Sequence, residues 1–380
     1  DDIKGIAFEE FLGKTFRGDL GQFFTPRTIV DFMVKILDPR EHEIICDPCC
    51  GTGGFLIGSF EYIKGNIEKD IENQKKLIRK NLEGPDFEKL PIKKQNEILI
   101  KINDAFAAIN KDLALFNEKS RLYDLSFRRI FGTDAEPRSA RTAKMNMIMH
   151  GDGHGGVHHH DGLININGIF ENRFDIIITN PPFGSRVSRD LEIVESDSYK
   201  DESKISYYKK IFGDEYSEAL KQVTDNIGNK LIDQFDTGKM SNLTEVLFLE
   251  RCIRLLKPGG RLGIVLPEGI LNIVQLQKIR EYFESKAKIL LIVSIPQEVF
   301  DKAGANVKTS LLFLKKFTAA EQDEYDSSVT KSVSEASKKF DPLISKILDP
   351  INVIESKISQ NINQVKKLKK TYIPKTENKQ

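Results

Sequence analysis

Residues 175–184 read DIIITNPPFG, and their types could bind a planar ring that carries an amino group. Three consecutive isoleucines predict a strand that is buried on both faces. The strand runs into Asn180, Pro181 and Pro182, where the two prolines stiffen the backbone and leave carbonyl groups free. The carboxamide and these carbonyls can accept from an amino group, and the Phe183 ring can stack on a planar ring. A plain strand-ending turn is the alternative, because Asn-Pro commonly begins turns.

A second polar turn, DPCCGTGGF at residues 47–55, lies between a short strand pattern and a helical pattern. Glycines at such a place let the backbone turn tightly and approach a ligand. The amides that begin the helix can hold an anionic group. A P-loop is excluded because no Gly-Lys-Ser/Thr follows, and the dinucleotide fingerprint is not cleanly matched. The next strand-end acid that could grip a ribose is Asp134.

The composition is that of an ordinary globular protein, with 39% hydrophobic and 30% charged residues in a chain of 380. This length predicts one large or two modest domains. The net charge of +1 shows no global basicity, so any nucleic-acid contact must come from a local patch or a partner. No apolar run is long enough to span a membrane. Because the chain begins at Asp1 and not at a methionine, we expect a fragment of a longer protein.

The cysteines and histidines bear on compartment and metal binding. Cysteines stand at four positions without disulfide spacing, which favours a reducing cytoplasm: Cys46, Cys49, Cys50 and Cys252. Adjacent cysteines are poorly spaced for zinc. His158, His159 and His160 are consecutive, and neighbouring strand residues alternate between faces, so they do not converge easily on one ion. We therefore expect no metal.

Strand and helix patterns alternate along the chain, which predicts an α/β fold with a mostly parallel sheet. Thr25 is expected to cap a helix that has Pro26 in its first turn and ends near Leu37. A clear helix is expected over 244–256. The apolar stretches near 288–296 and 309–317 are close in sequence, so an antiparallel pair is expected.

Three further segments carry little strand pattern. Residues 64–128 are charge-rich with helical apolar spacing, which predicts a helical insertion; a solvated hairpin without a function of its own is the alternative. Residues 185–243 are long, polar and irregular, which is typical of a functional or mobile loop. From about residue 327 the tail is expected to be helical.

The tail has apolar residues at intervals of seven. Two interleaved rows are formed by Ile351, Ile358 and Val365, and by Ile354, Asn361 and Leu368. This spacing resembles a short coiled-coil seam, and a helix packed on its own domain is the alternative. The basic run 366–370, KKLKK, could contact phosphate, although a solvated helix end suits it better.

The order of DPxxGTGG, a strand-end acid and NPPF resembles that of DNA amino-methyltransferases that use S-adenosylmethionine. The fuller set of GQFFTPR, DPCCGTGGF, GTDAEP, NPPFG and the stretch 300–313 resembles the N6-adenine DNA methyltransferases. More closely, it resembles the modification (M) subunit of type I restriction-modification systems. The resemblance covers about residues 1–316, and its specificity comes from the combination of motifs.

The resemblance implies a Rossmann-like class I S-adenosylmethionine-dependent methyltransferase fold. Its sheet would be mostly parallel and seven-stranded with a terminal antiparallel strand, with helical N-terminal, inserted and C-terminal segments added. It divides the chain into a helical segment at 1–42, a catalytic domain at 43–316 and a helical tail at 317–380 that binds a partner. The insertion at about 64–128 and the loop at about 185–243 belong to the catalytic domain.

The resemblance also implies which residues hold S-adenosylmethionine. Asp47 would receive the ammonium group, and Asp134 the ribose hydroxyls, with Glu136 as the fallback. Asp161 would accept from the adenine amino group of the cofactor; Asp152 competes for that role but follows a helix and not a strand. The residues implied around the methionine part are Gln22, Phe23, Phe24, Thr25, Pro26, Arg27, Thr52, Gly53 and Gly54. Gly51 and Phe55 are also implied in cofactor binding.

The catalytic group implied by the resemblance is Asn180, Pro181, Pro182 and Phe183. Asn180 and the Pro181 carbonyl would each accept one hydrogen of the target amine, which turns the nitrogen lone pair toward the methyl group. Phe183 would stack on an adenine flipped out of double-stranded DNA, and Phe300 would press its other face.

The resemblance implies a specificity (S) subunit as partner, and a restriction (R) subunit and a second M subunit as further members of the assembly. Sequence choice is expected to come from the specificity subunit or from a segment outside this sequence, because no target-recognition domain is visible. Two other readings stay open. One is methylation of protein glutamine or RNA, and the other is a non-catalytic assembly subunit.

Overall fold

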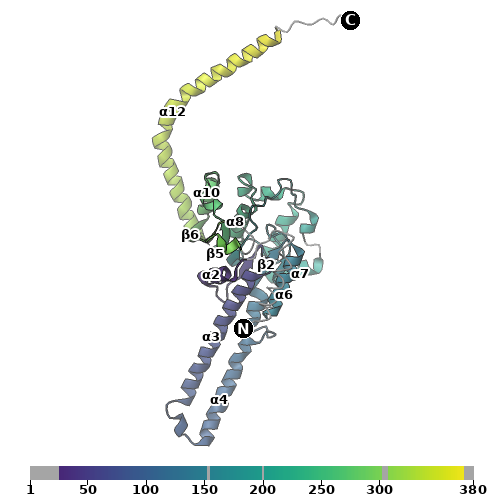
Figure 1. Ribbon diagram of the computed structural model, residues 1–380, viewed down its shortest axis with the longest axis vertical. Coiled ribbons are helices and arrows are strands. Elements are labelled where there is room, and N and C mark those ends of the chain that lie inside the picture. The colour runs from purple at the N-terminus through teal and green to yellow at the C-terminus, as the bar shows by residue number, and fades with distance from the viewer. Residues whose placement is uncertain (1–24, 152–154, 199–200, 302–306, 372–380) are drawn as a thin grey trace. The chain divides into compact units, whose positions relative to one another are not determined.

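The computed structural model describes residues 25–151, 155–198, 201–301 and 307–371 (Figure 1). Two compact units are distinguished, Asp1–Thr318 and Ala319–Gln380. Some of the residues that were predicted to bind the cofactor lie outside the described residues, and these are Gln22, Phe23, Phe24 and Asp152.

One seven-stranded sheet forms the centre of the first unit, in the order β3-β2-β1-β4-β5-β7-β6 (Figure 1). The strands are β1 Ile45–Asp47, β2 Ile130–Asp134, β3 Val157–His159, β4 Phe174–Thr179, β5 Leu256–Pro267, β6 Ala287–Ser294 and β7 Thr309–Lys316. Neighbours from β3 to β5 pair in parallel, and β7 is antiparallel to both β5 and β6. The predicted fold class is confirmed, and the antiparallel strand, though last in sequence, lies inside the sheet.

Helices cover both faces of this sheet. The α-helices of the first unit are α2 Arg27–Leu37, α3 Gly54–Glu83, α4 Ile92–Asn110, α5 Arg121–Asp124, α6 Pro137–Met149, α7 Glu202–Thr224, α8 Thr244–Leu255, α9 Gly269–Asn272, α10 Gln277–Glu284 and α11 Glu298–Asp301. Short 3₁₀ turns lie at Phe87–Lys89, Lys111–Leu113, Glu195–Asp197, Leu231–Gln234, Thr237–Lys239 and Val274–Leu276, and a π-helical turn at Leu125–Arg129. Within the described residues, no helix combines the length and hydropathy needed to cross a bilayer.

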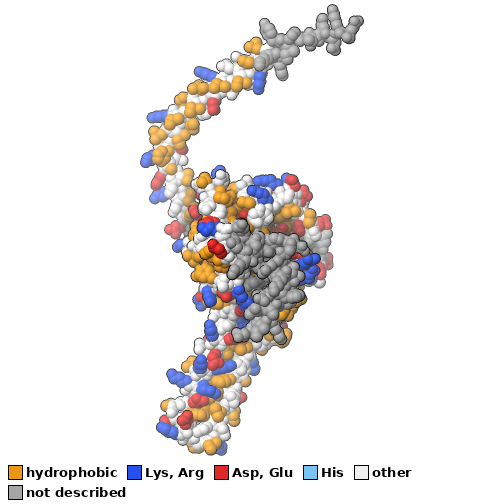
Figure 2. Space-filling view, in the orientation of Figure 1, with side chains coloured by type: hydrophobic (Ala, Val, Ile, Leu, Met, Phe, Trp, Pro, Cys, Tyr) orange, Lys and Arg blue, Asp and Glu red, His pale blue; other side chains and the backbone are white. Residues whose placement is uncertain are grey.

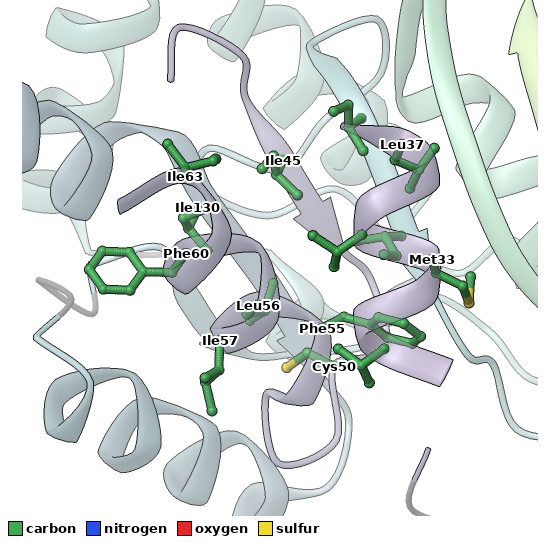
Figure 3. Packing of buried hydrophobic residues seen from close by; sticks show 14 of the residues in the cluster. Met33, Leu37, Ile45, Cys50, Phe55, Leu56, Ile57, Phe60, Ile63 and Ile130 are labelled. Atoms are coloured by element: carbon green, nitrogen blue, oxygen red, sulfur yellow. The ribbon is translucent and has the colours of Figure 1, made fainter. Parts of the chain in front are cut away.

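The isoleucines of β4 are buried on both faces of the sheet, as their sequence predicts. Ile176 and Ile178 belong to a core cluster with residues of α2, α3 and α6. Ile177 belongs to the opposite cluster, with residues of α8 and α10. Figure 3 shows the first cluster, in which α2 and α3 pack side chains such as Met33 and Phe60 over the strands. The hydrophobic effect of these two layers holds the strand ends in place.

The segment 185–243 was expected to be irregular, and that expectation is wrong for its central part, because α7 occupies Glu202–Thr224. The helix carries aromatic residues at intervals of four, and the rings of Tyr208 and Phe212 stack with centroids 6.2 Å apart. Phe212 also packs on the buried Arg173 guanidinium, 4.4 Å from its ring. The polar composition of the segment hid this aromatic stripe.

The helix that begins after the glycine-rich turn continues far beyond the sheet. α3 has 30 residues, and only its first five turns bear buried side chains. Its outer part packs along α4 (Figure 1). The insertion is therefore a helical hairpin whose first helix is the continuation of the helix that follows the glycine-rich turn.

Gly162, just after β3, lies against the backbone of Pro48. A Cβ at this position would overlap the Pro48 carbonyl oxygen, whereas a Cβ on Gly155 would have open space around it. We expect Gly162→Ala to lower the free energy of unfolding by about 1–3 kcal/mol, because the two backbones would have to separate. Gly155→Ala should change it by less than about 0.5 kcal/mol. Urea denaturation measures both, and equal losses in the two variants would contradict this explanation.

Candidate active site at the carboxyl ends of the strands

The carboxyl ends of β1 and β4 meet where the strand order changes direction. β2 and β3 lie on one side of β1, and β4 and β5 continue on the other. Open parallel sheets bind ligands in the crevice outside such a switch point. The two motif turns, 47–55 and 180–184, both begin here.

Asp47 is the last residue of β1 and is almost completely buried. Its Oδ1 accepts from the Thr179 hydroxyl at 2.5 Å and from the Cys49 amide at 3.1 Å. Burial raises the pKa of its carboxyl to about 7, although both hydrogen bonds act in the opposite direction. This carboxyl is thus poised to gain from a cationic ligand, which would favour its charged form.

The glycine-rich turn is held from two sides. Gly51 and Gly53 have φ angles of 55° and 91°, a region that favours glycine. The Gly51 amide donates to Asp134 Oδ2 at 2.9 Å, and Asn146 Nδ2 donates to the Thr52 carbonyl at 2.9 Å. Gly54 begins α3, and Phe55 is buried in the core. The packing of Phe55 in the core therefore fixes the position of the end of this turn.

Asp134 ends β2 and is also buried. Its two oxygens accept from the amides of Gly51 and Glu136, each at 2.9 Å, and burial raises the pKa of the carboxyl. Glu136, the fallback for the ribose role, is the N-cap of α6, and its side chain accepts from the Arg138 amide. Asp134 is therefore hydrogen-bonded to the glycine-rich turn, whereas the Glu136 side chain caps the N-terminus of α6.

Asp161 follows β3, and its Oδ1 accepts from the Leu163 amide at 2.9 Å. Burial raises the pKa of this carboxyl. The close approach of Gly162 to Pro48 brings the Asp161 loop against the Asp47 turn. The structure thus places Asp47, Asp134 and Asp161 at or just after the carboxyl ends of three neighbouring strands.

Asn180 is the first residue after β4. Its Nδ2 donates to Thr25 Oγ1 at 2.9 Å, while its Oδ1 is buried and has no hydrogen-bond partner in the described structure. Pro181 is buried and Pro182 is exposed. Buried acceptors without a partner are uncommon, so this oxygen is a candidate for a ligand's donor.

Thr25 does not cap α2, and that prediction is wrong. The N-cap is Pro26, without a side-chain cap, and its carbonyl accepts from the amides of Ile29 and Val30. The Thr25 hydroxyl instead meets Asn180. Arg27, the first residue of the helix, donates to Glu61 of α3 at 2.7 Å.

The two candidate stacking rings lie against one core cluster. Phe183 is partly buried and packs on the cluster that contains Phe300. Phe300 itself has no exposed surface. Phe183 thus has part of its ring available, and a stacking role for Phe300 stays a prediction that requires its cover to move.

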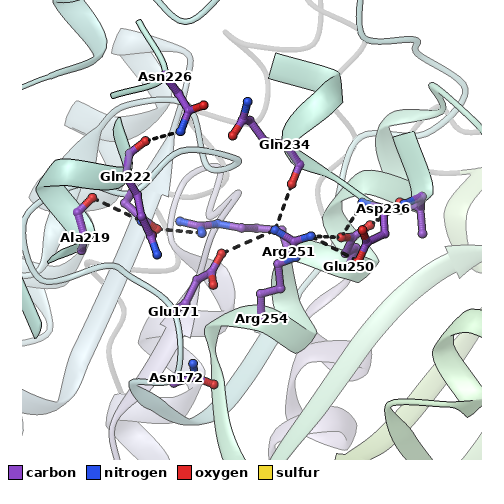
Figure 4. A network of polar contacts seen from close by, with 12 residues as sticks. Glu171, Asn172, Ala219, Gln222, Asn226, Gln234, Asp236, Glu250, Arg251 and Arg254 are labelled. Atoms are coloured by element: carbon purple, nitrogen blue, oxygen red, sulfur yellow. Dashed lines mark hydrogen bonds and ion pairs between the residues drawn. The ribbon is translucent and has the colours of Figure 1, made fainter. Parts of the chain in front are cut away.

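The support that α8 gives to the site was not predicted from the sequence. Glu245, in its first turn, accepts from the Gly184 amide at 3.3 Å, and burial raises the pKa of its carboxyl. Arg251 donates to the Gly162 carbonyl at 3.0 Å and to Asn165 Oδ1 at 2.8 Å. Figure 4 shows Arg251 beside Arg254, whose guanidinium contacts the Gln234 carbonyl and Glu250. The sequence feature that could have indicated this support is an acidic and a basic residue, Glu245 and Arg251, within a largely apolar helix pattern.

The three consecutive histidines contact three separate acceptors or donors. His158 Nδ1 lies 3.1 Å from Asn167, His159 Nε2 lies 3.1 Å from the Ala135 carbonyl, and His160 Nε2 lies 3.0 Å from the Asp197 carbonyl. Across the part of the chain that the structure describes, no three His, Cys, Asp or Glu side chains form a group that could hold a metal ion.

The N-6 DNA Methylase family profile matches residues 1–127 and 114–360. The chain belongs to this family. Similar curated proteins include the EcoEI type I methylase subunit of Escherichia coli, 24% identical over 79% of this chain and 43% of the relative. Another is the StySPI type I methylase subunit of Salmonella potsdam, 25% identical over 85% of this chain and 46% of the relative. The crystal structure of the type I EcoKI M protein is 22% identical, with a TM-score of 0.45 over 80% of this chain and 46% of that one. The chain thus spans less than half the length of these relatives, and the predicted family is confirmed.

Asp47→Asn tests the buried carboxyl. The asparagine Oδ1 keeps both acceptor roles, and the titratable group disappears. Burial raises the folded-state pKa from 3.8 to about 7, so the stability of the wild type falls as pH rises toward 7, and the variant lacks this loss. The free energy of unfolding of the variant, relative to that of the wild type, should therefore rise by about 2–3 kcal/mol between pH 5 and pH 8.

Thermal melts of both proteins across this pH range make the measurement. Asp31→Asn, on an exposed position of α2, controls for the loss of one negative charge. A difference between Asp47→Asn and wild type that is the same at every pH would contradict the raised pKa.

Proposed function

We propose that the chain is the modification subunit of a type I restriction-modification system and transfers a methyl group from S-adenosylmethionine to N6 of adenine in DNA. The observation that carries the proposal is the Asn180 carboxamide, with its buried and unpartnered Oδ1 at a switch point lined by three strand-end acids. Membership of the N-6 DNA Methylase family and similarity to type I methylase subunits support it.

The residues at the strand ends fit S-adenosylmethionine. Asp47 would hold the ammonium group, since a cation returns its carboxyl to the charged form. Asp134 would hold the ribose hydroxyls, and Asp161 the adenine amino group of the cofactor. Gly51 to Gly54, with Pro26 and Arg27, would enclose the methionine part. When bound, this cofactor supplies an electrophilic methyl group on a sulfonium.

The base-binding turn can do its work without a covalent intermediate. Asn180 Oδ1 would accept one hydrogen of the adenine amine, and the Pro181 carbonyl the other. The amine nitrogen would become more positive as it attacks the methyl group. The two acceptors would stabilise this charge through their hydrogen bonds to the amine. Phe183 would stack on the flipped base, and stacking of about 1–3 kcal/mol per base offsets part of the cost of flipping. Two rigid prolines keep the geometry constant during the reaction.

Asn180→Ala removes one of the two acceptors for the amine. We expect methyl transfer to unmethylated DNA to fall at least about 100-fold, because an electrostatic acceptor at the reacting atom is lost. Cofactor binding should stay within about threefold of wild type. Mass spectrometry of N6-methyladenine and calorimetry with S-adenosylmethionine give the two readings.

Asn226→Ala, in the turn two residues after the end of α7, is the matched control and should leave both readings unchanged. Methylation by Asn180→Ala at the normal rate would contradict the role of this side chain. Assays with RNA and with a glutamine-containing protein in parallel separate the proposed substrate from the two other methyl acceptors.

The second unit offers a surface for the specificity subunit. α12, Ala319–Thr371, is a helix of 53 residues. Apolar side chains are exposed along it in Figure 2, and they are Val329, Val333, Phe340, Leu343, Ile344, Ile347, Leu348, Ile351, Val353, Ile354, Ile358, Ile362, Val365 and Leu368. An isolated helix gains little by exposing such a row, so a partner helix is the natural cover.

We infer that α12 binds the specificity subunit, which would supply sequence choice and much of the DNA contact that a net charge of +1 does not explain. A restriction subunit and a second modification subunit complete the proposed assembly. We place the assembly in the cytoplasm, where the four free cysteines would stay reduced.

The double variant Ile351→Glu, Ile358→Glu tests the inferred seam. It should lower affinity for the co-expressed specificity subunit at least about tenfold, because two charges would be buried without partners. Asn352→Glu, Ser359→Glu introduces the same charges one residue further along and should retain binding. Co-purification and calorimetry make the comparison, and equal retention by both double variants would contradict the seam.

A further inference from the structure

We propose that Thr25 is a positioning residue for Asn180: its hydroxyl fixes the plane of the carboxamide so that Oδ1 faces the target amine. The inference rests on the proposed function and deepens it. Thr25 comes from the segment that the sequence assigned to helix capping and cofactor contact, and neither of those roles explains its hydrogen bond.

The contact joins two parts of the chain that are 155 residues apart. Asn180 Nδ2 donates to Thr25 Oγ1 at 2.9 Å, and the other end of the same amide, Oδ1, has no partner although it is buried. One end of the carboxamide is therefore tied to the protein, and the other is left for a ligand's donor. An asparagine that was merely structural would be expected to use both ends.

The carboxamide needs such a tether because its terminal torsion is soft. The rotation about χ2 of asparagine is broad and roughly two-fold, so backbone rigidity alone does not fix the amide plane. Pro181 and Pro182 fix the main chain after Asn180 but leave this torsion free. A single hydrogen bond to Nδ2 removes the freedom that remains.

Thr25 is itself placed by rigid structure. Pro26 follows it, and α2 begins at Arg27. The buried face of α2 includes Val30 and Met33, which pack into the same core cluster as Ile178 of β4. The helix starts without a side-chain cap, which normally costs about 1 kcal/mol of stability. The Thr25 hydroxyl, which could have capped α2, instead accepts the hydrogen bond from Asn180.

Thr25→Val removes the hydroxyl and keeps the β-branched shape. In the complex purified with its partner subunits, we expect kcat on unmethylated DNA to fall about tenfold or more, because a misplaced acceptor reduces transition-state stabilisation. KM for S-adenosylmethionine and for DNA should stay within about threefold. Thr25→Ser retains the hydroxyl and should restore kcat to within about threefold of wild type.

Thr28→Val makes the same chemical change three residues later, at an exposed position of α2, and should behave as wild type. A crystal structure of Thr25→Val should show the Asn180 amide in a new or mixed orientation on an unchanged turn. A structural role alone would lower the melting temperature and would not separate kcat from KM.

The inference is overturned if Thr25→Val keeps the wild-type kcat, or if Thr25→Ser loses as much kcat as Thr25→Val. It is also overturned if the Asn180 amide is unmoved in the Thr25→Val crystal. Absence of N6-methyladenine with the wild-type complex would instead refute the proposed function. The two failures are therefore distinguishable within one set of assays.

Discussion

The hydrogen bond between Asp47 and Thr179 is the interaction on which the arrangement of the site depends. It joins the last residues of β1 and β4, two parallel strands that are neighbours in the sheet. The residue after Asp47 begins the glycine-rich turn, and the residue after Thr179 is Asn180. One buried carboxyl therefore sets the spacing between the proposed cofactor turn and the proposed base turn. Its desolvation is costly, and the Thr179 hydroxyl and the Cys49 amide offset only part of that cost.

A second layer of support comes from α8, on the far face of the sheet. Glu245 holds the turn after Phe183 through the Gly184 amide, and Arg251 holds the loop after Asp161 through the Gly162 carbonyl. One helix thus restrains the two loops that are proposed to read two different adenines, one in the cofactor and one in DNA. Because both contacts are buried or partly buried, a shift of α8 would displace both the loop after Phe183 and the loop after Asp161.

The sequence predicted the parts of the site that depend on local rules. Consecutive isoleucines predicted β4, the glycines at 51–54 predicted a tight turn before a helix, and Asp134 and Asp161 were expected at strand ends, where the structure places them at or just after β2 and β3. The capping role of Thr25 was wrong because a tertiary partner, Asn180, lies 155 residues away and competes for the same hydroxyl. α7 was missed because its aromatic stripe packs on Arg173, a buried cation that no local pattern reveals. Neither error could be corrected without the packing.

The same distinction separates the chemistry from the choice of DNA sequence. The acceptors proposed for the amine and for the cofactor come from strand ends that two buried clusters hold in place, so they need no partner to be in position. Recognition of many bases requires a surface with donors and acceptors that match a groove. The balanced charge of the chain and the exposed apolar row of α12 are better suited to holding another subunit that carries such a surface. Under the proposed function, the same strand-end acceptors would serve different target sequences when the partner subunit changes, because a flipped adenine always presents the same amine.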